Sequence, residues 1–263
     1  MAKIESYKPG SFVWAELHTT DVAAAKNFYG DMFGWTYIDH PMPNGVYTIF
    51  QADGNDVAAA VPAMPGMPPN WGVYFSVTDL DASTAKVTEL GGEVAMGPMD
   101  VGDPGSMTLA KDPDGVHFAL WKGKNHIGST HGGPLNRVVW PELMTPDEIG
   151  AVDFYTGLFG WSTKPASGIE SAEYVEWVNH GESIGGMLPM RGDQWQGVPP
   201  HWQVYVTVAD CDERVARATA LGAKICVPPR DIPNTGRFAM FFDPQGAAIS
   251  IIQMTGTHQP AAA

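Results

Sequence analysis

The first clear pattern in the chain is an alternation of two faces. Phe12 to His18 reads FVWAELH, and a period of two predicts a β-strand. We expect one face of this strand to pack on a helix and the other to lie on the opposite, inner side of a sheet. The helix face carries Val13, Ala15 and Leu17, and the inward face carries Trp14, Glu16 and His18. Thr20 and Asp21 then predict a helix from Val22 to Gly30.

Further strands and a second helix follow. Strands are predicted at 47–52 and 57–61 around a turn at 53–55, and another at 71–77. Asp79 predicts the start of a helix that runs to Leu90 and ends at Gly91 and Gly92. A last hairpin is predicted from strands at 107–111 and 117–121. The predicted unit is one strand, one helix and three strands (βαβββ), and it occurs twice in this stretch.

The whole pattern is then repeated. Residues 14–17 (WAEL) recur 126 residues later as 140–143 (WPEL), and 112–115 (DPDG) return as 243–246 (DPQG). A unit this long is a duplicated domain, since solenoid repeats have periods of about 20–50 residues. We predict an α+β protein of four βαβββ modules, with domains at 8–124 and 134–256 and a linker at 125–133. His126 and His131 lie in this glycine-rich connection, where we expect solvated side chains rather than metal ligands.

Composition narrows the classes of function. The chain has 263 residues and a formal net charge of −14, with 15 scattered Lys and Arg residues. Nucleic acid and membranes are not expected partners, because both nucleic acid and anionic lipid require clustered positive charge. No apolar run approaches the ~18 residues of a membrane span, and no secretory pattern opens the sequence, so we expect the cytoplasm. Cys211 and Cys226 are too few for a disulfide framework or a cysteine-rich metal site.

These motifs resemble a known family. A helix ending in Phe28 and Tyr29, followed by FGW at 33–35, VTDLD at 77–81 and the DPDG turn, is similar to the vicinal oxygen chelate superfamily. That superfamily includes glyoxalases, extradiol dioxygenases and bleomycin resistance proteins. Within it, the chain resembles tandem, two-domain glyoxalase-like proteins of actinobacteria. The resemblance implies that each pair of βαβββ modules forms a half-open barrel around a cavity.

The resemblance also implies where a metal would be bound. Metal-dependent members hold a divalent ion with His, Gln or Glu side chains on the inner faces of first and last strands. The matching positions are Trp14, Gly72 and Ala119 in the first copy and Trp140, Gln203 and Ser250 in the second. Of these, Gln203 alone could coordinate a metal, so we expect no metal and no other cofactor. The alternative is a divalent ion held in a shifted register by Glu16, His18 and His117.

Both copies keep an inward carboxylate among aromatic side chains. Glu16 is the candidate general base, with His117 and Tyr74 as further candidates for proton transfer. The candidates for ligand binding are Trp14, His18, Trp121, Trp140, Glu142, Tyr205, Gln203 and Arg237. Structural alternatives stay open: the carboxylates can be paired within the protein, the tyrosines can be core, His117 can be structural, and Arg237 can form a surface ion pair.

Three functions remain, and each involves a small-molecule ligand. The first is a metal-independent lyase, isomerase or hydrolase that acts on an apolar or aromatic metabolite, with Glu16 as base. The second is a protein that sequesters an aromatic natural product without converting it. The third is a divalent-metal lyase or dioxygenase with non-standard ligands. We expect the chain to be a monomer or a homodimer.

Overall fold

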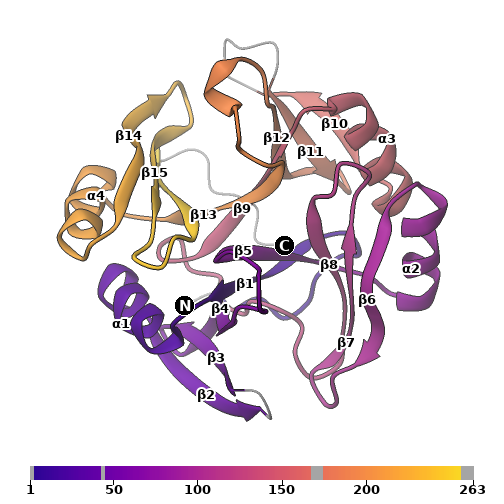
Figure 1. Ribbon diagram of the computed structural model, residues 1–263, viewed down its shortest axis with the longest axis horizontal. Coiled ribbons are helices and arrows are strands. Elements are labelled where there is room, and N and C mark those ends of the chain that lie inside the picture. The colour runs from indigo at the N-terminus through magenta and orange to yellow at the C-terminus, as the bar shows by residue number, and fades with distance from the viewer. Residues whose placement is uncertain (1–2, 43–44, 167–173, 256–263) are drawn as a thin grey trace.

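The computed structural model describes residues 3–42, 45–166 and 174–255. Within these ranges four βαβββ modules follow one another (Figure 1), which confirms the predicted fold. The first two modules are β1 (Phe12–Thr19), α1 (Val22–Phe33), β2 (Thr36–Met42), β3 (Gly45–Ala52), β4 (Asn55–Pro62), then β5 (Asn70–Ser76), α2 (Leu80–Glu89), β6 (Glu93–Asp100), β7 (Gly105–Lys111) and β8 (His117–Gly123). The last two are β9 (Val138–Thr145), α3 (Glu148–Phe159), β10 (Ser162–Pro165), β11 (Val175–Asn179), β12 (Glu182–Pro189), then, after the 3-10 turn η1 (Asp193–Trp195), β13 (His201–Thr207), α4 (Cys211–Ala220), β14 (Lys224–Ile232), β15 (Gly236–Phe242) and β16 (Ala248–Met254).

The helices begin at the predicted capping residues. Asp21 and Asp79 each accept a hydrogen bond from the backbone N–H three residues further on, at 2.9 and 3.0 Å, which satisfies a donor that the first helical turn leaves free. α1 runs to Phe33, beyond the predicted end at Gly30, and stops at Gly34, whose φ of 68° suits glycine. No helix in the described ranges is long and apolar enough to cross a membrane.

Each copy forms one mixed, eight-stranded sheet. The strand order is β2-β3-β4-β1-β5-β8-β7-β6 in the first copy and β10-β11-β12-β9-β13-β16-β15-β14 in the second. The first strands of the two modules run antiparallel, with Glu16 opposite Gly72 and Glu142 opposite Gln203. Each first strand also pairs in parallel with the last strand of its own module. The inward glutamates therefore lie at the centre of each sheet.

The edge strands β2 and β6 have no counterpart among the strands assigned from sequence. Every residue of β2 is exposed, and so are most residues of β6. A strand without a buried face carries no alternation of apolar and polar residues. The alternation of apolar and polar residues therefore located only two of the three strands that follow each helix of the first copy.

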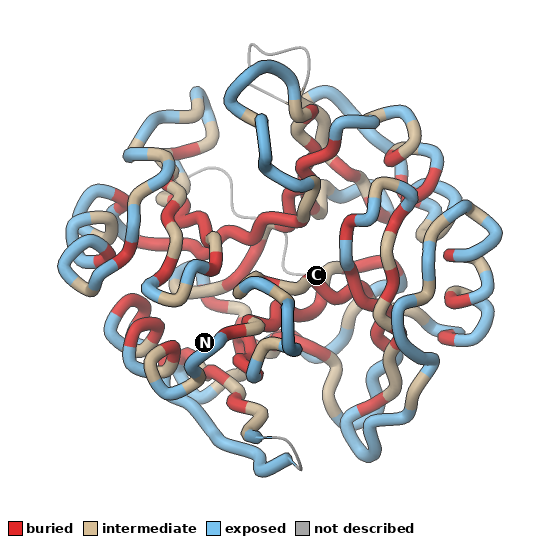
Figure 2. The backbone as a smooth tube through the Cα atoms, in the orientation of Figure 1, coloured by how far each residue is buried: buried red, intermediate tan, exposed pale blue. Residues whose placement is uncertain are grey.

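The helix-side faces of the two sheets share one apolar core. A single buried cluster runs through both copies, and the rings of Phe75 and Trp202 lie 5.3 Å apart across it. One smaller cluster lines the opposite, inner face of each sheet. Figure 2 shows the buried backbone concentrated in the central strands of both copies. The helix-side faces of the two copies thus pack into one common core, whereas each copy has a separate inner face.

β1 departs from simple alternation at its start. A register shift lies between Phe12 and Trp14 in the pairing of β1 with β5. Val13 consequently packs in the inner-face cluster with Trp14, while Phe12 packs against the shared core. The expectation that Val13 faces the helix was wrong, because a bulge adds one residue that a strict period of two does not anticipate. Ala15 and Leu17 lie in the shared core as predicted.

Two reciprocal hydrogen bonds connect the copies. Tyr29 of α1 donates to Asp243 Oδ2 at 2.9 Å, and Tyr155 of α3 donates to Asp112 Oδ2 at 3.0 Å. Each aspartate is the first residue of the DPDG or DPQG turn in the other copy. The second oxygen of Asp112 accepts two backbone N–H groups of its own turn. Burial nevertheless raises the pKa of Asp112 to about 6.

Asp112→Asn should remove a pH dependence of stability. The folded-state pKa of Asp112, about 6, lies above its ordinary value of 3.8, so the protonated form stabilises the fold at low pH and this contribution is lost as the pH rises from about 4 to 6. The free energy of unfolding of the wild type relative to Asp112→Asn should fall by up to about 3 kcal/mol over that interval. Urea unfolding across this range measures it, and a difference that does not change with pH would contradict the prediction.

Candidate functional site

Glu16 is buried on the inner face of the first copy and is hydrogen-bonded there. Tyr74 of β5 donates to Glu16 Oε1 at 2.8 Å, and Glu16 is only 7% exposed. Tyr47 of β3 lies near the same carboxylate, whose charge helps to raise the pKa of the Tyr47 phenol. Trp14 donates its indole N–H to the Tyr47 hydroxyl at 3.0 Å. These aromatic donors offset part of the free-energy cost of burying a carboxylate.

The second copy repeats this arrangement. Trp140 donates to the Tyr174 hydroxyl at 2.9 Å. Tyr174 donates to Glu142 Oε2 at 2.6 Å, and Tyr205 donates to Glu142 Oε1 at 2.8 Å. Both oxygens of Glu142 are therefore hydrogen-bonded. Burial raises the pKa of Glu142, and the two tyrosine hydrogen bonds partly oppose that rise. We refer to each set of four side chains as a Trp–Tyr–Glu–Tyr network.

Small residues let one tyrosine of each network reach the carboxylate. β4 lies between β3 and β1, and there Ala59 pairs with Glu16. In the second copy Gly186 pairs with Glu142, and a Cβ atom on Gly186 would collide with the Tyr174 hydroxyl. The tyrosine thus spans an intervening strand that carries almost no side chain at this point.

All four tyrosines of the networks are neutral donors. Burial first, and then the charge of the neighbouring glutamate, raise the pKa of each phenol well above its ordinary value. This holds for Tyr47, Tyr74, Tyr174 and Tyr205. The glutamate of each network is therefore the group that can accept a proton, and the tyrosines can donate hydrogen bonds to it or to an oxygen of a ligand.

The two copies differ beside the carboxylate. In the first copy His18 Nε2 lies 3.4 Å from Glu16 Oε1, and the ring fits against Gly72. The other ring nitrogen of His18, Nδ1, is buried and has no hydrogen-bond partner among the described residues. The second copy has buried Met144 and Gln203 at these two positions. The first copy thus places a second proton-exchanging group beside its carboxylate, where the second copy has a thioether.

The connection between the copies covers part of the first inner face. Trp121 donates its indole N–H to the backbone oxygen of His126 at 2.8 Å, and the His126 ring lies 4.6 Å from the ring of Trp14. Burial lowers the pKa of His126, and His131 is fully buried. The expectation of solvated histidines here was wrong, because backbone hydrogen bonds hold residues 129–130 against β1 and β4.

Two predicted site residues lie apart from the networks. Arg237 of β15 forms ion pairs with Asp212 of α4 at 2.6 Å and with Asp231 at 3.0 Å, so its charge is paired. His117 is exposed at the start of β8, where partial burial and the charge of Lys111 lower its pKa. The structure brings together Trp14, Glu16, His18, Tyr74 and Trp121 in the first copy and Trp140, Glu142, Gln203 and Tyr205 in the second.

The positions that carry metal ligands in related proteins do not form a metal site here. Trp14, Gly72 and Ala119 offer no coordinating atom, and Gln203 donates its amide to Ser250 Oγ at 3.2 Å. Across the described ranges, no three His, Cys, Asp or Glu side chains are grouped as a metal ion requires. The donor set therefore does not fit a divalent ion.

Tyr47 and Tyr174 are site residues that the sequence analysis did not identify. Each lies at or just before the third strand of its copy, 127 residues apart, close to the offset that relates the WAEL and WPEL segments. That recurrence, together with the small residues Ala59 and Gly186 on the next strand, was the available indication. Neither observation predicts a contact unless the order of strands in the sheet is known.

Tyr174→Phe should destabilise the protein by about 1–3 kcal/mol. The change removes a donor to buried Glu142 and leaves the Trp140 N–H without its acceptor. Urea or thermal unfolding measures the loss. Tyr37→Phe is the matched control, since Tyr37 is 48% exposed, and it should stay within about 0.5 kcal/mol of the wild type. Equal losses in the two variants would contradict a stabilising role for the network.

Comparison with known proteins agrees with the duplicated fold. The family model described as "Glyoxalase/Bleomycin resistance protein/Dioxygenase superfamily" matches residues 11–120 and again 135–251. "Putative glyoxylase CFP32" of Mycobacterium tuberculosis (strain CDC 1551 / Oshkosh) is 39% identical over 262 residues, which cover 96% of this chain and 98% of that protein. "Anthracycline biosynthesis protein DnrV" of Streptomyces peucetius is 39% identical over 280 residues, covering 98% of each chain.

A solved structure shares the fold at lower identity. The Mn(II)-bound glyoxalase from Novosphingobium aromaticivorans matches with a TM-score of 0.67 and 19% identity, covering 96% of this chain and 86% of that chain. At this identity the likeness describes the fold alone. Its metal is consequently a property of that protein.

Proposed function

This chain belongs to the glyoxalase/bleomycin resistance protein/dioxygenase superfamily, and from that premise we propose that its first copy is a metal-independent enzyme of the lyase or isomerase type. Its substrate is a small apolar or aromatic metabolite, and Glu16 is the base that takes a proton from it. The observation that carries the proposal is a buried carboxylate with a tyrosine donor at 2.8 Å and His18 at 3.4 Å. The second copy lacks that histidine.

The surroundings of Glu16 favour an aromatic substrate. Trp14, Tyr47 and Trp121 provide ring faces and edges around the carboxylate. Aromatic walls of this kind suit a flat apolar ligand. The similarity to DnrV, a protein named for anthracycline biosynthesis, supports the same class of substrate.

The three polar groups have separate roles in this reaction. Glu16 accepts a proton from a carbon next to a carbonyl, and the C–H electrons form an enolate. The Tyr74 hydroxyl stays neutral, and in the free protein it donates its one proton to Glu16. Once Glu16 has taken the substrate proton, this hydroxyl turns to donate to the oxygen that becomes negative. His18 exchanges the proton with Glu16 and returns it at a different atom, which gives isomerisation. Loss of a leaving group from the enolate instead gives the lyase reaction.

The second copy supports a second candidate function, sequestration of the ligand. Both oxygens of Glu142 already accept tyrosine hydrogen bonds, and Met144 stands beside them. Without a histidine beside it, Glu142 has no group with which to exchange a proton, and its remaining lone pairs can accept a hydrogen bond from a polar group of a ligand. If the first copy acts in the same way, the protein binds an aromatic natural product without converting it.

Exchange of carbon-bound hydrogen distinguishes these functions. With a ketone that carries an aromatic ring, such as 2-tetralone, in D₂O, the wild type should accelerate the loss of the NMR signal of the hydrogens next to the carbonyl. Glu16→Gln should lower this rate by at least about 100-fold, and His18→Met, which copies the second network, should also lower it. Glu142→Gln is the matched control and should stay within about threefold of the wild type.

The outcomes separate the two candidates. Unchanged exchange in Glu16→Gln would exclude Glu16 as the base. Saturable quenching of tryptophan fluorescence by the ketone, without exchange above the buffer rate, would support sequestration instead.

Chelation should leave the protein and its exchange activity unchanged. Elemental analysis of purified protein should give far less than one Zn, Mn, Ni or Fe per chain, because the ligand positions carry Trp14, Gly72 and Ala119. Treatment with EDTA should leave the exchange rate of the wild type as it was. About one tightly held ion per chain, lost together with activity, would overturn the metal-independent proposal.

A further inference from the structure

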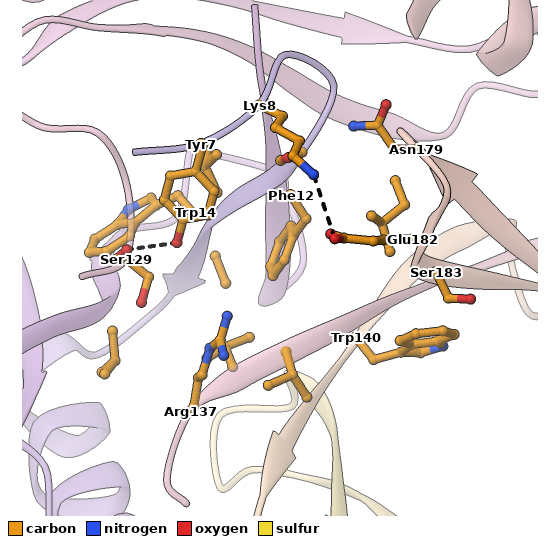
Figure 3. Close-up of a pocket in the computed structure, with 17 residues that line it drawn as sticks. Tyr7, Lys8, Phe12, Trp14, Ser129, Arg137, Trp140, Asn179, Glu182 and Ser183 are labelled. Carbon is orange, nitrogen blue, oxygen red and sulfur yellow. Dashed lines mark hydrogen bonds and ion pairs between the residues drawn. The ribbon is translucent and has the colours of Figure 1, made fainter. Parts of the chain in front are cut away.

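A separate hollow lies between the two copies, where β1 and β9 begin (Figure 3). Its cavity volume is about 60 Å³. One water needs roughly 10–15 Å³ of such a cavity, so the hollow has room for several waters or a small organic anion. Equivalent positions of the two copies face one another across it: Phe12 and Val138, Val13 and Val139, Trp14 and Trp140.

The hollow contains a cation, Arg137, that forms no ion pair with any of the residues that the structure describes. Arg137 immediately precedes β9, and in Figure 3 its side chain points toward Phe12. Its Nε is buried and has no hydrogen-bond partner in the described part of the chain. Burial lowers the pKa of Arg137, whereas two aspartates raise the pKa of Arg237, the ion-paired arginine of β15. Arg137 therefore lacks the carboxylate that a partly buried guanidinium requires.

The other polar groups of the hollow do not balance this charge. Lys8 and Glu182 lie 3.6 Å apart and neutralise each other. Tyr7 donates its hydroxyl to the Ser129 backbone oxygen at 2.6 Å, and burial raises its pKa to about 12, so it is not an anion. One positive charge remains, surrounded mainly by apolar walls.

The protein holds this arginine in a fixed position. The backbone N–H of Arg137 donates to Thr207 Oγ1 at 3.2 Å, and its carbonyl accepts the Thr207 N–H at 3.0 Å. Thr207 is itself buried. The backbone of Arg137 is thus anchored to β13 directly before β9 begins, and a ligand that binds the guanidinium does not need to order this backbone.

We propose that this hollow binds a small monocarboxylate, with its carboxylate on the Arg137 guanidinium and its apolar tail against Phe12 and Val138. One cation matches one negative charge, and the planar guanidinium can donate two parallel hydrogen bonds to a carboxylate. Inorganic phosphate is disfavoured, because its second charge would be unpaired beside Glu182. The site is independent of the reaction proposed at Glu16.

Calorimetric titration with propionate at constant ionic strength tests the proposal on the full chain. The wild type should show saturable binding, and Arg137→Gln should raise the Kd at least about tenfold. Lys122→Gln, which removes the same charge from an exposed residue, should leave the Kd within about twofold. Arg137→Lys keeps the cation without the planar fork and should weaken binding to an intermediate degree. Circular dichroism and unfolding curves identify any variant that does not fold.

Propionamide, which has nearly the same shape without the charge, should not bind. Four results would overturn the proposal: no saturable binding of propionate to the wild type, equal weakening in Lys122→Gln, binding of propionamide as tight as that of propionate, or tighter binding of inorganic phosphate. Retained binding of propionate by a folded Arg137→Gln would overturn it as well.

Discussion

The packing of both helix-side faces into one core is the constraint on which the rest of the structure depends. Leu17 and Leu143 lie in that core, and because side chains alternate along a strand, Glu16 and Glu142 must point to the other side. A slip of one residue would place a carboxylate in the shared core, so the register is strongly specified. The Tyr29–Asp243 and Tyr155–Asp112 hydrogen bonds connect the same two faces.

The sequence predicted those parts of the molecule that follow from local pattern. The repeat was sufficient to predict the duplicated domain, and the alternation within each first strand was sufficient to place Glu16 on the face opposite Leu17. Tyr47 could not be found in this way, since its contact with Glu16 crosses a strand that intervenes in the sheet but follows β3 in the chain. The placement of Val13 failed for a related reason, because a bulge depends on the pairing of β1 with β5.

The networks use two of the positions to which the family resemblance assigns metal ligands, Trp14 and Trp140. The position of Trp14 carries an indole N–H, which donates to a phenol that approaches the central carboxylate. The centre of each inner face therefore carries a carboxyl group that accepts hydrogen bonds from tyrosines. The copies share this arrangement and differ in its neighbours, with His18 and Gly72 in one and Met144 and Gln203 in the other.

The hollow between the copies has a consequence for the origin of duplicated proteins. Ser11 of the first copy and Arg137 of the second occupy equivalent positions and both line it. In a symmetric dimer of identical single-copy chains, an arginine here would occur twice, and two guanidiniums would repel each other across the two-fold axis. When both copies lie in one chain, a substitution in one copy no longer has to occur in the other. A single mutation can then place one charge on a symmetry axis, which no homodimer can do.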